Sequence, residues 1–137
     1  MIRRHLLAIG LPSLLLIAVA VLLVTGCAPA LEAEDVTQLR VRVLGGNEIE
    51  LDGEVGQRWA ERLTTAFEAQ EGGTTELCDC AEEMWVTLAR TGDRDLELAR
   101  IADGVRASAV GMPVRQYGEG PLSEALDALQ RDLSLDN

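Results

Sequence analysis

The sequence predicts a small α+β domain behind an N-terminal hydrophobic segment, in the order ββαβαβα, with helices packed on a mixed sheet. After residue 37 the hydrophobic period switches several times between two residues and about 3.6. About 110 residues follow Cys27, which is enough for one domain with a modest core and too few for two. We therefore divide the chain into an N-terminal hydrophobic segment with the character of a signal peptide (1–26), a flexible acidic tether that begins at Cys27 (27–36) and a folded domain (37–137).

The domain begins with a predicted β-hairpin. Apolar and charged residues alternate from Leu39 to Val43, as is typical of a half-buried strand. Gly45-Gly46-Asn47 can adopt the positive φ angles of a tight turn, and Ile49 and Leu51 continue the alternation.

Arg40 and Arg42 project together from the face of this hairpin that is opposite its apolar residues. We expect them to pair with Glu48 and Glu50 across the hairpin. An anionic-ligand site at the two arginines is the alternative.

A helix is predicted after Asp52-Gly53, where the period becomes helical. Trp59, Leu63 and Phe67 fall on one face of it, and Gly72-Gly73 ends it. The position of the two aromatic residues on the apolar face predicts core packing rather than stacking on a ligand.

The second half of the domain is predicted to be strand, helix, strand and helix. A strand covers Met84–Ala89, and Trp85 within it is expected to be core if helices cover both faces of the sheet. A short strand covers Val114–Tyr117, and the last helix begins at Pro121. The intervening helix is expected to bury Leu98, Ile101, Ala102, Val105 and Ala109.

The N-terminal segment has the parts of an export signal. Arg3 and Arg4 precede an uncharged run from Leu6 to Gly26, which ends in Val24-Thr25-Gly26-Cys27. These four residues resemble the lipobox of bacterial lipoproteins. The resemblance implies cleavage before Cys27, a diacyl lipid on its thiol and a further acyl chain, such as palmitate, on the new amino terminus. An uncleaved membrane anchor is the alternative, because about 20 apolar residues span a bilayer.

The same segment predicts where the domain lies. The basic start is retained in the cytoplasm, so the domain is placed outside. Several acyl chains hold a protein stably on a membrane. Ala28, rather than aspartate, follows Cys27, and this resembles the pattern sorted to the outer membrane in Gram-negative bacteria. We therefore expect a lipid-anchored protein on the outer membrane, facing the periplasm.

The composition after cleavage excludes several function classes. Ten of the twelve basic residues remain, all arginine, against 23 acidic ones, which gives a net charge of −13. With no histidine and no lysine, the mature chain cannot form an imidazole-based triad, a Schiff base or a phosphate-loop site. The acidic excess also opposes nucleic-acid binding. We predict no enzyme activity, no cofactor, no metal site and no nucleic-acid partner.

Cys78 and Cys80 are the only thiols besides Cys27. An even pair in an exported protein suggests a disulfide. Two residues along an extended strand lie about 6.6 Å apart, whereas disulfides prefer Cα separations of about 5.5–6 Å. We therefore predict that the pair lies in a turn before the third strand.

Three alternatives to a structural disulfide stay open: an intermolecular disulfide, a redox pair and a two-thiolate metal site. Glu76, Asp79, Glu82 and Glu83 surround the thiols with negative charge, which disfavours a nucleophilic thiolate. Zinc prefers four ligands, so two thiolates without histidine would need carboxylates or a second subunit.

The arrangement of elements over residues 39–117 resembles a known domain. The hairpin ends in Glu48-Ile49-Glu50-Leu51-Asp52-Gly53, and the strand Trp85–Arg90 runs into the acidic turn Gly92–Asp95. This order resembles the periplasmic domain of ExbD and TolR proteins, which implies a dimerising domain that contacts envelope partners. In that family an aspartate of the membrane helix carries protons, and residues 1–26 contain no acid, so neither a motor role nor any functional residue is carried over. A ferredoxin-like α+β domain of unrelated ancestry is the alternative.

Together these features predict a lipid-anchored, non-enzymatic module of the cell envelope that binds a protein partner or forms a homodimer. The alternatives are a thiol/disulfide redox factor that uses Cys78 and Cys80, and an accessory subunit of an envelope complex.

Overall fold

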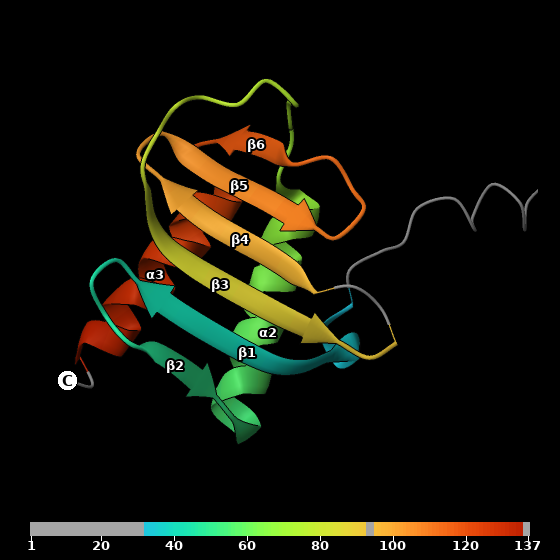
Figure 1. Cartoon of the computed structure of the whole chain (residues 1–137). Helices are drawn as coiled ribbons and strands as arrows, with labels where there is room; N and C mark the ends of the chain where they lie inside the picture. The colour runs from blue at the N-terminus through green and yellow to red at the C-terminus, as the bar shows by residue number, and fades with distance from the viewer. Residues whose placement is uncertain (1–31, 93–94, 136–137) are drawn as a thin grey trace, which may run out of the picture. The chain divides into compact units, whose positions relative to one another are not determined.

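A computed structural model describes residues 32–92 and 95–135, so the signal segment and Cys27 lie outside the described residues. The α+β fold is confirmed: six strands and two long helices form one small domain (Figure 1). The elements are η1 (Ala33–Asp35), β1 (Val36–Val43), β2 (Glu48–Leu51), α2 (Gly53–Ala69), β3 (Glu82–Arg90), β4 (Leu96–Ile101), β5 (Gly104–Ala109), β6 (Arg115–Gly118) and α3 (Pro121–Leu135).

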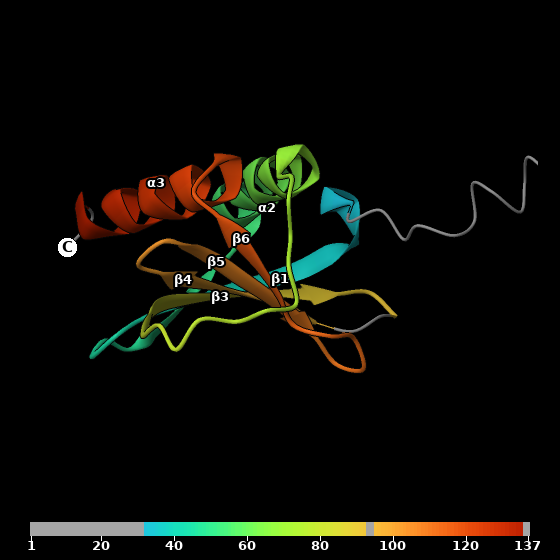
Figure 2. The ribbon, with the colours of Figure 1, turned by 90° about the horizontal axis from the view of Figure 1, so that it is seen from above.

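The strands form one sheet in the order β2-β1-β3-β4-β5-β6. Every pairing in it is antiparallel, so the expectation of a mixed sheet was wrong. The reason is that no helix connects two neighbouring strands of the β3–β6 series, and short turns join antiparallel neighbours. Both helices lie on the same face of the sheet (Figure 2).

The core lies between that face and the two helices. Side chains from β1, β3, β4 and β5 meet the apolar sides of α2 and α3, as the strand period of two and the helical period require. These residues are almost completely shielded from solvent, and they include Leu39, Val41, Val86, Leu98, Trp59, Leu63, Leu122 and Leu126. Phe67 meets the Tyr117 ring edge-on at 6.1 Å between centroids. The predicted core roles of Trp59 and Phe67 are confirmed.

The helix expected between the third strand and Gly111 was wrong, because this stretch is the β4–β5 hairpin. Its apolar residues fit a helical spacing only because both faces of β4 are buried: Leu98 faces the helices, and Ala99, at 3% exposure, faces away. Ala102 and Asp103 form the turn, and Gly104 begins β5. A Cβ on Gly104 would lie 1.8 Å from the carbonyl oxygen of Tyr117, so this position requires glycine for the close approach of β6.

One charged side chain enters the helix-covered side of the sheet. Arg100, whose side chain is 11% exposed, donates hydrogen bonds to both carboxylate oxygens of Asp127 on α3 and to the carbonyls of Ile101 and Gly104. Glu119 lies 3.1 Å from the same guanidinium. The hydrogen bond to Asp127 raises the pKa of Arg100 despite its partial burial, so Arg100 fastens α3 to the hairpin as a cation.

Neither α2 nor α3 is long and apolar enough to cross a membrane, and the same holds for the rest of the described residues.

Candidate functional site on the open face of the sheet

The face of the sheet away from the helices has no layer of secondary structure over it (Figure 2). Because side chains alternate across a strand, this open face carries the residues between the core positions. The strand registers set them in two rows across the sheet. One row is Glu50, Arg40, Thr87, Glu97 and Ser108, and the other is Glu48, Arg42, Trp85, Ala99, Arg106 and Gln116.

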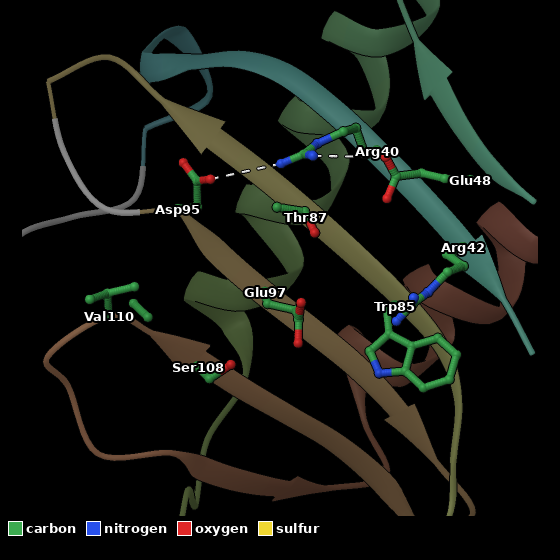
Figure 3. A pocket seen from close by; sticks show the side chains of 10 residues that line it. Arg40, Arg42, Glu48, Trp85, Thr87, Asp95, Glu97, Ser108 and Val110 are labelled. Atoms are coloured by element: carbon green, nitrogen blue, oxygen red, sulfur yellow. Dashed lines mark ion pairs between the residues drawn. The ribbon is translucent and has the colours of Figure 1, made fainter.

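Arg40 lies between two carboxylates on this face. Its guanidinium is 3.8 Å from Glu48 on β2 and 3.8 Å from Asp95 at the start of β4 (Figure 3). Pairing between Arg40 and Glu48 was predicted and is confirmed. Both contacts are long and partly exposed, and such pairs contribute little to stability.

Arg42 does not follow the predicted pairing. Its guanidinium stacks over the Trp85 ring, with the Cζ atom 4.5 Å from the ring centroid. Within the described residues it forms no ion pair, so its hydrogen-bonding edge faces solvent. Trp85 therefore lies on the open face beside an arginine, and the condition for its being core, helices on both faces of the sheet, does not hold.

These side chains line a shallow hollow of about 570 Å³ on the open face (Figure 3). Arginines of β1 form one side of the hollow, and Asp95 and Glu97 form the other, with Val110 at the margin. Glu97 has no ion pair within the described residues. The hollow therefore presents one cation and one anion that are free to meet groups of opposite charge on a partner.

A chain of contacts leads from the hollow to the cysteine pair. The Trp85 Nε1–H donates to Glu82 Oε2 at 2.6 Å, and the second oxygen of Glu82 accepts from Arg106 Nη1 at 3.2 Å. Arg106 Nη2 donates to the carbonyl oxygen of Cys78 and lies 3.6 Å from its Sγ. The contacts therefore link Arg42, above Trp85, to a sulfur atom across three strands.

Cys78 and Cys80 are joined in the structure, with their Cα atoms 5.2 Å apart. They lie where the sequence placed them, in an irregular segment directly before β3. The Cys78 N–H donates to Gln116 Oε1 at 2.9 Å, which fixes this segment to β6. Pairing of the two thiols stays a prediction until it is measured on the protein.

Arg106 is the residue of this site that sequence reasoning missed. The charged residues near the cysteines in the sequence are all acidic, whereas the cation that contacts Cys78 in the structure comes from 28 positions further on. The register of the β4–β5 hairpin brings Arg106 beside Cys78, and the hairpin was taken for a helix. The Asp103-Gly104 pair is a turn signal, and a hairpin predicted from it would have placed Arg106 on a strand.

The two edges of the sheet are protected from further pairing. Beyond β6, Thr74 exchanges two backbone hydrogen bonds with Gln116, at 2.9 and 2.8 Å, and so covers that edge. At the other edge β2 is only four residues long and carries Glu48 and Glu50. Short, charged edges resist strand addition. Both edges are therefore poor sites for the addition of a further strand.

The chain matches no protein-family model, no curated protein and no solved structure. In the part of the chain that the structure describes, no three histidine, cysteine or acidic side chains are grouped so that they could hold a metal ion. Cys27, the predicted lipidation site, lies outside the described residues.

Proposed function

We propose that the protein is an exported lipoprotein, anchored through acylated Cys27, whose domain is a non-enzymatic module that binds a protein partner on the open face of the sheet. The observation that carries the binding surface is the hollow between Arg42 and Glu97, where two opposite charges have no ion-pair partner among the described residues, on a face that no helix or strand covers.

The chemistry of the hollow defines the partner. An arginine whose apolar face rests on Trp85 still presents its N–H donors outward, in the geometry that accepts a carboxylate. Glu97, two strands away, accepts from a cation. We therefore expect a protein surface with a carboxylate and a cationic side chain about 12 Å apart, since Arg42 and Glu97 are separated by two strand spacings of about 4.8 Å and by two residues along the strand, about 6.6 Å.

A second copy of the chain is the less favoured occupant. Each domain carries a large negative charge, and two copies repel each other at low salt. A homodimer would have to bring together two molecules of the same net negative charge, whereas a different protein need not carry that charge. The size of the open face suits a second copy and a different protein equally well, so we favour a different protein on the ground of net charge.

Binding is tested by crosslinking in intact cells and capture through a tag after Asn137, in parallel for wild type, Arg42→Glu and the control Arg58→Glu. Arg58 lies on α2, on the opposite side of the sheet, and its replacement makes the same change in charge. We expect one stoichiometric envelope protein with wild type and Arg58→Glu, unaffected by reductant, and an approximately tenfold loss with Arg42→Glu. Equal capture by all three would reject the open face.

The anchor is tested separately. Wild type is expected to incorporate labelled fatty acid and to begin at Cys27 when its N-terminus is analysed by mass spectrometry, whereas Cys27→Ser is expected to take up no label and to keep residues 1–26. A wild-type protein that keeps residues 1–26 and takes up no fatty acid would support the uncleaved hydrophobic anchor instead.

A further inference from the structure

Arg106 gives the cysteine pair a chemical asymmetry. Its guanidinium contacts the carbonyl oxygen and the sulfur of Cys78 but not Cys80. Among the described residues, Cys80 has no interaction besides the bond to Cys78. Both cysteines are half-buried, so a reagent can reach them. The two sulfurs therefore differ in how well the protein stabilises a negative charge on each.

A cation next to a sulfur favours the thiolate, and a stabilised thiolate is the better leaving group in disulfide exchange. The side chain of Arg106 is only 16% exposed, so solvent screens its charge less than that of a surface arginine. Its Nε also lacks a hydrogen-bond partner, while Nη1 is bound to Glu82 and Nη2 to Cys78. The arginine is thus fixed with one nitrogen directed at the sulfur.

We propose that Cys78–Cys80 is an exchangeable disulfide that accepts electrons from a protein dithiol, with Cys80 as the attacked sulfur and Cys78 as the leaving thiolate beside Arg106. This proposal is independent of the binding function of the open face. It assigns Arg106 the role of stabilising the charge that develops on Cys78.

The exchange balances in two steps. A thiolate of the donor attacks Cys80 Sγ and forms a mixed disulfide, and the electron pair of the broken Cys78–Cys80 bond moves to Cys78 Sγ. The second donor thiol, once deprotonated, then attacks the first donor sulfur and releases the Cys80 thiolate. One donor dithiol is oxidised to a disulfide, and the Cys78–Cys80 disulfide is reduced to two thiols, which take up protons from water according to pH.

The first test is the rate at which excess reduced glutathione opens the disulfide of the purified protein, followed by alkylation and mass spectrometry. We expect Arg106→Gln to be slower than wild type by about three- to tenfold, and Arg106→Lys to recover most of the rate, because it keeps the charge. Arg58→Gln, which removes a distant arginine, is expected to match wild type. Equal rates for Arg106→Gln and wild type would overturn the proposal.

The variant Glu82→Gln distinguishes an effect of the Arg106 charge on Cys78 from an effect of Arg106 in holding the cysteine loop in place. Glu82 partly neutralises Arg106 at 3.2 Å, so its removal leaves more positive charge for Cys78 and should raise the rate about twofold. If Arg106 acted only by holding the loop in place, loss of either partner would free the loop and both variants would be opened faster. A faster Arg106→Gln therefore contradicts the proposal, and opposite signs support it.

The attacked sulfur is identified by acid quenching of the glutathione reaction before completion, alkylation and peptide mapping. We expect glutathione on Cys80 and the alkyl group on Cys78. The reverse pattern would overturn the assignment even if the rates followed the expected order.

Discussion

The two faces of the sheet are built from alternating residues of the same strands, yet they serve different ends. On the covered face, leucine and valine side chains are sealed by α2 and α3. On the open face, arginine, glutamate and tryptophan side chains meet water and one another. The covered face holds the domain together, whereas most side chains of the open face contribute less to its stability.

The two tryptophans show the contrast in one residue type. Each has an arginine stacked on its ring, Arg62 on Trp59 and Arg42 on Trp85, and each donates its Nε1–H to a carboxylate. Trp59 is 4% exposed and packs in the core, whereas Trp85 lies half-buried on the open face. The two tryptophans therefore have similar local contacts but different environments. Trp59 is buried in the core, whereas Trp85 lies on the face of the sheet that no helix covers.

Replacement of each tryptophan by alanine should give the largest single loss of stability, on the covered face, and a much smaller loss on the open face. We expect Trp59→Ala to lower the free energy of unfolding by about 4 kcal/mol, through loss of a large buried ring. Trp85→Ala is expected to cost about 1.5 kcal/mol, from a partly exposed ring and one hydrogen bond. Urea unfolding of both variants checks this, and equal losses would show that the open face is covered in solution.

Adjacent residues of β4 sharpen the comparison, because Glu97 and Leu98 point to opposite faces. Leu98→Ala should cost about 3 kcal/mol, since a fully buried side chain leaves a cavity. Glu97→Ala should change stability by less than about 0.5 kcal/mol, as expected for a surface site. A large loss for Glu97→Ala would reveal a structural role that its exposed position does not suggest.

Replacement of an arginine by alanine should also lower stability more on the covered face than on the open face, although the difference is smaller than for the previous pairs. Arg100→Ala removes the contacts that join β4 to α3 and is expected to cost about 2 kcal/mol, less than a fully buried pair, because its acidic partners are partly exposed. Arg42→Ala is expected to cost less than about 0.5 kcal/mol. Paired unfolding curves measure both, and similar values would argue against a structural role for Arg100.

The Arg100 effect has a defined pH dependence. A cation whose pKa is raised on folding adds stability that is fully present below the pKa of the unfolded chain and is lost only at higher pH. The difference between wild type and Arg100→Ala should therefore stay constant between about pH 6 and 9. A difference that fell across this range would mean that another titrating group controls the contact.

Only a modest effect on stability is expected at the cysteine pair. The two cysteines are only two positions apart in the sequence, so the disulfide restricts the unfolded chain little. Their replacement by serine should therefore lower the free energy of unfolding by about 1.5 kcal/mol or less. Unfolding with and without reductant should thus shift little in wild type. A much larger shift would show that the disulfide is mainly structural and would weaken its assignment as an exchange site.

The sequence predicted the parts of the fold that follow local rules. The β1–β2 hairpin and both helices were found because turn residues and amphipathic periods identify them without tertiary information. The β4–β5 hairpin was missed because Arg100 occupies a position facing the helices and Ala99 is buried on the other face, so the period of two is obscured. Burial by elements distant in sequence overrode the local pattern.

The candidate site depends still more on distant contacts. The projection of Arg40 and Arg42 to one face follows from alternation alone, and it was predicted. The contact between Arg106 and Cys78 requires the registers of β3, β4 and β5 together with the path of the loop before β3, and no local spacing encodes those. Chemistry that is assembled across strands becomes visible only in the folded chain.

Thr74 has a consequence for a protein that is confined to a membrane surface. Chains held in two dimensions meet each other far more often than chains free in solution, so an unpaired strand edge becomes a nucleus for unwanted stacking. The bridge from Thr74 to Gln116 closes one edge within the chain itself. If the protein is anchored as proposed, this bridge leaves one edge fewer for pairing between neighbouring copies on the membrane.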